Sequence, residues 1–139
     1  MALVQKNEIV EIEITGMTTQ GAGVGHYQGM AVFTPLTAPG DVARVRVVKA
    51  AKNYAYGRLE ELVSPSADRM EPDCPCFAQC GGCCYRHITY EAELGIKAAR
   101  VKDALTRIGG FHSLPVRPIL GADSRDGYRN KALLPLGTK

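Results

Sequence analysis

Cysteine is absent from the whole chain except for one stretch of eleven residues, in which all five cysteines lie between Cys74 and Cys84. Five thiols in one short loop cannot all pair with one another, which argues against a disulfide framework. The chain also lacks an apolar run of about eighteen residues, so no membrane-spanning helix is predicted. The first residues lack the basic region and apolar core of a signal peptide. We therefore expect a cytoplasmic protein whose thiols are kept reduced.

Short alternating patterns of apolar and polar residues fill residues 1–63. Along 10–15 the period is two, which predicts a half-buried strand. Similar patterns at 30–35, 41–49 and 53–62 are separated by residues that favour turns. Five short strands in a segment of this length predict a small closed or partly closed barrel.

The glycines of the stretch Gly21-Ala-Gly23-Val-Gly25 do not have the spacing of a dinucleotide-binding loop. A strand-like pattern follows them, whereas a phosphate-binding loop leads into a helix. We expect these glycines to give a tight barrel loop its positive φ angles.

The formal net charge is only +3, but every charged residue between Val42 and Leu59 is basic. Tyr54 and Tyr56 are interleaved with these cations, as on surfaces that bind single-stranded RNA through phosphate contacts and base stacking. The alternative is that the cations only solvate the outer face of the barrel while the tyrosines fill its ends. The cations are Arg44, Arg46, Lys49, Lys52 and Arg58.

The cysteine-rich loop favours a metal site over a haem site or a redox pair. A c-type haem site requires Cys-x-x-Cys-His, which the adjacent Cys83 and Cys84 do not provide. A thioredoxin-like redox pair lacks its βαβ context. Thiolates select zinc or iron–sulfur centres, and the spacing leaves both open. A local zinc site would use Cys74 or Cys76 together with Cys80, Cys83 and His87.

Residues 89–110 predict one amphipathic helix that packs against a core. Its N-cap is Thr89, and Gly109-Gly110 ends it. Its apolar face consists of Leu94, Ala98, Val101, Leu105 and Ile108. Residues 126–139 then form a strand-like run without partner strands, and we expect them to open a domain that continues beyond this chain.

Three features resemble the bacterial 23S ribosomal RNA (uracil-C5)-methyltransferases. The pattern C-P-x-F-x-x-C-G-G-C-x-x-x-H-x-x-Y, from Cys74 to Tyr90, resembles the family's iron–sulfur loop. Residues 1–63, with the turn Pro39-Gly40-Asp41 ahead of a basic strand, resemble its TRAM domain, a barrel of the oligonucleotide-binding type. Gly127–Lys131 reproduce its Gly-Tyr-Arg-Asn-Lys segment.

The resemblance implies a mainly β fold with an α+β extension, in three parts: a five-stranded TRAM-like barrel (1–63), a cluster loop (64–90), and a helix with the start of an incomplete domain (91–139). It also implies three ligands of a [4Fe-4S] cluster, at Cys74, Cys80 and Cys83. The family's fourth ligand lies further along than this chain extends. Cys76 and Cys84 fall on positions that are not ligands, although either of them, or His87, could substitute.

The family transfers a methyl group from S-adenosyl-L-methionine to C5 of a uracil in structured RNA. Its nucleophile, general base and cofactor pocket lie in a C-terminal domain, so no catalytic residue is assigned here. The resemblance implies ribosomal RNA as the partner, with no membrane and no protein partner. It favours RNA contact by the basic stretch and its tyrosines, and by Arg129, Asn130 and Lys131. The alternative is a free-standing RNA-binding adaptor with a structural zinc loop.

Overall fold

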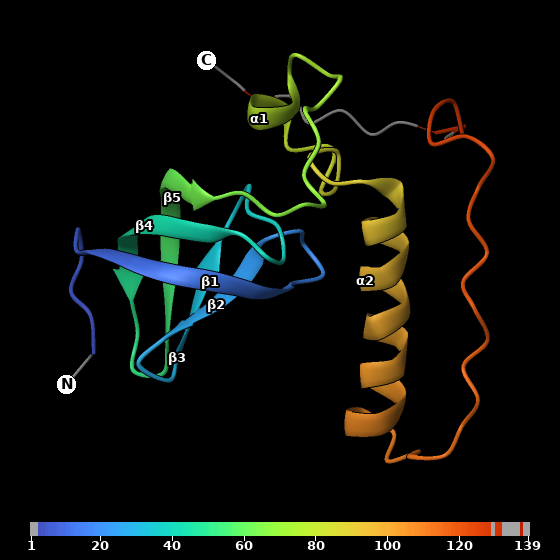
Figure 1. Cartoon of the computed structure of the whole chain (residues 1–139), viewed down its shortest axis with the longest axis horizontal. Coiled ribbons are helices and arrows are strands. Elements are labelled where there is room, and N and C mark those ends of the chain that lie inside the picture. The colour runs from blue at the N-terminus through green and yellow to red at the C-terminus, as the bar shows by residue number, and fades with distance from the viewer. Residues whose placement is uncertain (1–2, 129, 132–136, 138–139) are drawn as a thin grey trace.

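The computed structural model describes residues 3–128, 130–131 and 137. Figure 1 shows a barrel, a cysteine-containing segment above it, and a long helix beside it. The strands are β1 (Ile9–Met17), β2 (Gly23–Tyr27), β3 (Met30–Thr34), β4 (Val42–Ala50) and β5 (Tyr54–Ser64). The helices are α1 (Phe77–Cys80), α2 (Tyr90–Asp103) and the π-helix η1 (Ala104–Ile108). No helix in the described part of the chain is long and apolar enough to cross a membrane.

The five strands close into a barrel in the order β1-β2-β3-β5-β4. Neighbouring strands run antiparallel, except for the parallel pair of β3 and β5 that closes the barrel. The alternating residues predicted to be buried do point inward, and Ile14, Val32 and Val45 are completely buried. The prediction of a small five-stranded barrel is therefore confirmed.

The glycine-rich stretch contains β2, a strand that the sequence pattern did not locate. The prediction of positive φ holds for Gly21, at 82°, but is wrong for Gly23 and Gly25. A Cβ at Gly23 would lie 2.0 Å from Thr37 Oγ1, and one at Gly25 would lie 2.6 Å from the Glu13 carbonyl oxygen. These two glycines instead allow close approach between parts of the barrel.

The predicted helix is present, and Thr89 caps it by accepting a 3.3 Å hydrogen bond from the Ala92 amide. Its last turns, Ala104–Ile108, are π-helical. The prediction that its apolar face packs against a core is wrong for the described chain, because α2 buries no residue and Ile108 is 88% exposed. The helix stands beside the barrel, and the following segment runs back along it as an extended chain (Figure 1). On the predicted apolar face Leu94, Ala98 and Leu105 are only half-buried.

The predicted strand at 126–139 falls partly outside the described residues, which omit 129, 132–136 and 138–139. Its described residues form bends and irregular backbone without a strand. A strand needs a neighbour for its backbone hydrogen bonds, and the barrel is already closed by its own five strands.

Substitution of Gly57 tests how tightly the barrel interior is packed. A Cβ at this position would lie 2.0 Å from Val45 Cγ1, so Gly57→Ala must displace a fully buried side chain. We expect a loss of about 1–3 kcal/mol in the free energy of unfolding, measured by urea denaturation. Gly16→Ala is the matched control, because a Cβ at Gly16 meets nothing within 4 Å. Equal losses in the two variants would contradict this packing.

Candidate nucleic-acid interface and cysteine segment

Three aromatic side chains gather on the outer face of β3 and β5. The parallel register places Phe33 opposite Tyr56, with ring centroids 5.6 Å apart. Tyr54 lies 6.1 Å from Phe33 and 5.6 Å from Tyr56, in edge-to-face arrangements. Tyr54 is 39% exposed and Tyr56 is 44% exposed, so neither fills an end of the barrel. We call Phe33, Tyr54 and Tyr56 the aromatic cluster.

Two lysines carry positive charge at or near the aromatic cluster. In the pairing of β4 with β5, Lys49 lies opposite Tyr56. Lys52 lies in the connection just before Tyr54. Both lysines are exposed, and among the described residues neither forms a salt bridge. Their ammonium groups are therefore available to a polyanion.

The three arginines of the basic stretch are already paired with carboxylates. Arg44 lies 2.8 Å from Glu61 and 3.4 Å from Glu11. Arg46 and Arg58 both hydrogen-bond to Glu60 at 2.8 Å, and these bonds lower the pKa of Glu60 to about 2. The acidic residues that flank the basic stretch in sequence thus return to it in the folded barrel.

The second set of predicted RNA contacts lies after the long helix. Asn130 and Lys131 are exposed and belong to no strand or helix. Arg129 lies outside the described residues.

All five cysteines are free thiols, with Cys74 and Cys84 half-buried and the other three exposed. Cys76 precedes the short helix α1, Cys80 ends it, and Gly81 turns the chain with a φ of 68°. The donor chemistry suits zinc or an iron–sulfur cluster. The arrangement of the thiols does not suit a metal ion. Among the described residues, no three His, Cys, Asp or Glu side chains lie close enough together to hold one.

We call residues 64–90 the cysteine segment. His87 holds this segment against the barrel. The side chain is 3% exposed, and its Nε2 lies 3.0 Å from the Thr37 carbonyl oxygen. Because a carbonyl only accepts, Nε2 carries the proton and only Nδ1 keeps a lone pair. The Phe77 ring of α1 lies 5.4 Å away. Burial lowers the pKa of His87 and outweighs the Thr37 hydrogen bond, so the imidazole is neutral.

A buried carboxylate makes the second attachment. Asp41 accepts hydrogen bonds from Arg69 Nε at 2.9 Å, from the Ser66 amide at 2.8 Å and from the Ala38 amide at 2.6 Å. Burial acts to raise the pKa of Asp41, but Arg69 and the two amides hold it below its usual value. Arg69 also donates to the Leu36 carbonyl oxygen at 2.7 Å.

Residues 3–59 match the TRAM domain family. The barrel is therefore similar to a TRAM domain, and we refer to it below by that name. Curated relatives confirm the resemblance to RNA methyltransferases that the sequence suggested. An uncharacterized RNA methyltransferase of Halalkalibacterium halodurans is 43% identical over 138 residues, which are 99% of this chain and 30% of the relative. One of Synechocystis is 44% identical over 132 residues, which are 95% of this chain and 28% of the relative.

The chain therefore spans about three tenths of the length of these relatives. Among solved structures, the chain is similar to the tRNA (uracil-54, C5)-methyltransferase of Pyrococcus abyssi in complex with S-adenosyl-L-homocysteine. The identity is 28%, over 72% of this chain and 21% of that chain, with a TM-score of 0.44.

Sequence reasoning missed the residues that join the TRAM domain to the cysteine segment. Asp41 was recognised only as part of a turn, and its partner Arg69 is 28 residues away. Cys84 packs against the loop between β1 and β2. A Cβ added at Gly21 in this loop would lie 2.6 Å from the Cβ of Cys84. The sequence contains the turn and the glycine, but only the closed barrel brings them to the segment.

The neutral His87 makes the attachment of the TRAM domain sensitive to pH. Below the ordinary pKa of 6.5, the unfolded chain binds a proton at His87 that the folded interface excludes. The free energy of unfolding should therefore fall as the pH drops from about 7 to 5, by at most about 1.4 kcal/mol per pH unit from this residue.

Urea titrations across this pH range should show a flatter profile for His87→Gln than for the unsubstituted chain. His26→Gln, at an exposed strand position, is the matched control and should leave the profile unchanged. Identical profiles for all three proteins would contradict a buried neutral imidazole.

Proposed function

We propose that this chain is the RNA-recognition part of an S-adenosyl-L-methionine-dependent RNA methyltransferase that modifies C5 of a uracil. The observation that carries the proposal is the aromatic cluster on a TRAM domain, with exposed rings at Tyr54 and Tyr56. Exposed rings of this kind stack unpaired bases, and each stacked base contributes about 1–3 kcal/mol. The names of the curated relatives support the methyltransferase assignment.

The charges around the aromatic cluster favour single-stranded RNA. Lys49 and Lys52 can contact phosphates without first breaking a salt bridge within the described chain. The arginines at 44, 46 and 58 remain candidates for RNA contact, but each would have to exchange or share its carboxylate partner. Structured ribosomal RNA with an exposed loop would supply both unpaired bases and phosphates.

The remaining parts of the chain keep their proposed roles. Residues 1–63 form the RNA-binding domain, 64–90 the cysteine loop, and 91–139 the helix and the start of the next domain. Asn130 and Lys131, together with Arg129, are proposed to add a second RNA contact. S-adenosyl-L-methionine and the catalytic residues belong to the part of the parent protein that this chain does not include, so no catalytic step is assigned to it.

We also propose that Cys74, Cys80 and Cys83 hold an iron–sulfur cluster in the parent protein. The donor set and the family resemblance support this proposal, and Gly81 and Gly82 give the backbone freedom to wrap around a cluster. The thiols must move together to do so, because the described arrangement does not gather them. His87 is a poor substitute for the fourth ligand, because its Nε2 is bound to Thr37 and its ring is buried.

Removing the rings of Tyr54 and Tyr56 tests RNA recognition. We expect Tyr54→Ala combined with Tyr56→Ala to weaken binding of a single-stranded RNA oligonucleotide by at least about fivefold, because at least one stacked base is lost. Fluorescence anisotropy with the whole chain measures the effect. The double Tyr→Phe variant keeps both rings and should bind as the unsubstituted chain does. If the alanine variant binds equally well, the aromatic cluster is not the RNA site.

Metal and acid-labile sulfide analysis of the parent protein, purified without oxygen, tests for the iron–sulfur cluster. Iron with sulfide is expected, and it should be lost in Cys74→Ser, Cys80→Ser and Cys83→Ser. Cys76→Ser and Cys84→Ser are the matched controls and should retain it. Stoichiometric zinc without sulfide would contradict the cluster and favour the RNA-binding adaptor with a structural zinc loop.

A further inference from the structure

A recess separate from the aromatic cluster lies between the cysteine segment, α2 and residues 122–128. Its volume is about 500 Å³, which is within the range of pockets that hold small ligands. No residue of the barrel strands lines it. We call it the tyrosine–arginine cavity, and the lining residues used below are Tyr85, Arg86, Tyr90, Lys97 and Arg125.

Arg86 builds the wall of this cavity and is not free to bind a ligand. Its Nε donates to Asp73 at 2.7 Å, and its Nη2 donates to Asp126 at 2.6 Å. The two carboxylates come from different segments of the chain, one before the cysteines and one after α2. Arg86 thus fixes residues 122–128 against the cysteine segment.

The two tyrosine rings are held in place by their hydroxyl groups. Tyr85 Oη accepts a 2.6 Å hydrogen bond from Arg100, and Tyr90 Oη accepts a 2.7 Å hydrogen bond from the Ala122 amide. Lys97 Nζ lies 5.7 Å from the centroid of the Tyr85 ring but is paired with Glu93 at 2.5 Å. The aromatic walls are therefore positioned before any ligand arrives.

Arg125 is the cation in this wall that forms no salt bridge within the described residues, although its charge helps to lower the pKa of Asp73. Its guanidinium lies 5.7 Å from the centroid of the Tyr90 ring, and its weak polar contact is to Met70 Sδ at 4.0 Å. Within the described residues no acidic side chain lies within 4.0 Å of it. A guanidinium of this kind can bind a phosphate through two parallel hydrogen bonds.

We propose that the tyrosine–arginine cavity takes one unpaired nucleotide of the RNA bound by this chain, with its phosphate on Arg125 and its base against the tyrosine rings. The inference rests on the proposed function, since it takes RNA as the partner. An apolar ligand would leave the Arg125 charge unused. A simple anion would leave the aromatic walls unused, whereas a nucleotide satisfies both.

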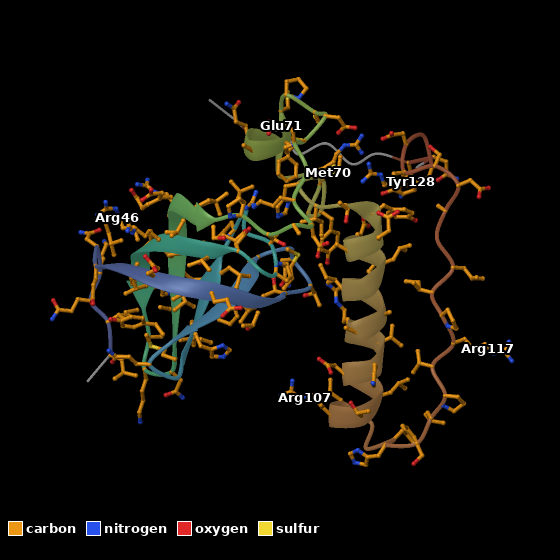
Figure 2. The ribbon with its side chains drawn as sticks, viewed as in Figure 1. Arg46, Met70, Glu71, Arg107, Arg117 and Tyr128 are labelled. Atoms are coloured by element: carbon orange, nitrogen blue, oxygen red, sulfur yellow. The ribbon has the colours of Figure 1, made fainter. Side chains whose placement is uncertain are left out.

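An RNA hairpin with one bulged 2-aminopurine tests the inference on the whole chain. We expect Arg125→Gln to weaken binding of this hairpin about tenfold and to lower the slope of log K against log salt by about 0.7. Arg117→Gln is the matched control, because it removes one positive charge from the same segment, where the side chain points away from α2 (Figure 2). Arg117→Gln should bind the hairpin as the unsubstituted chain does.

Two further comparisons distinguish binding of a nucleotide from binding of phosphate alone, and the tyrosine–arginine cavity from the aromatic cluster. Adenosine monophosphate should displace the 2-aminopurine at concentrations where inorganic phosphate does not, and equal displacement by phosphate alone would overturn the nucleotide site. Equal effects of Arg125→Gln and Arg117→Gln would also overturn it. If the Tyr54→Ala and Tyr56→Ala variant loses binding while Arg125→Gln does not, the proposed function stands and this inference falls. If the unsubstituted chain binds no RNA, both fall.

Discussion

The ion pair of Asp41 and Arg69 joins the barrel to the segment that carries the cysteines. Asp41 is fully buried at the turn before β4, and Arg69 reaches it from the segment that leads to the cysteines. Removing one partner of such a pair leaves an uncompensated charge, which costs about 3–5 kcal/mol. Together with His87 on Thr37, the pair makes the TRAM domain and the cysteine segment one folded unit. The cysteine loop is therefore presented at a fixed position relative to the barrel.

Folding redistributes the charge that the sequence displays. In the sequence the basic stretch is a continuous run of positive charge. In the barrel β4 lies between β1 and β5, which places Glu11, Glu60 and Glu61 next to its arginines. Exposed salt bridges of this kind contribute little stability. Their main effect is to leave Lys49 and Lys52 as the cations near the aromatic cluster that form no salt bridge within the described residues.

Local patterns allowed much of this structure to be predicted. Alternation along 10–15 and 41–49 identified two barrel strands because one face of each is buried. The strand at Gly23–Tyr27 was missed because glycines hide its alternation. The incomplete burial of the apolar face of α2 was missed because helical periodicity does not say what covers that face. Contacts such as Asp41 with Arg69 depend on the closed barrel, and no local signal contains them.

The central claim is that bases stack on the aromatic cluster of the TRAM domain. Photocrosslinking of the whole chain to a single-stranded RNA carrying 4-thiouridine, followed by mass spectrometry of the crosslinked peptides, tests it most directly. Crosslinks are expected at Phe33 or at Tyr54 and Tyr56. Crosslinks confined to β1 and β2, with none on β3 or β5, would contradict it.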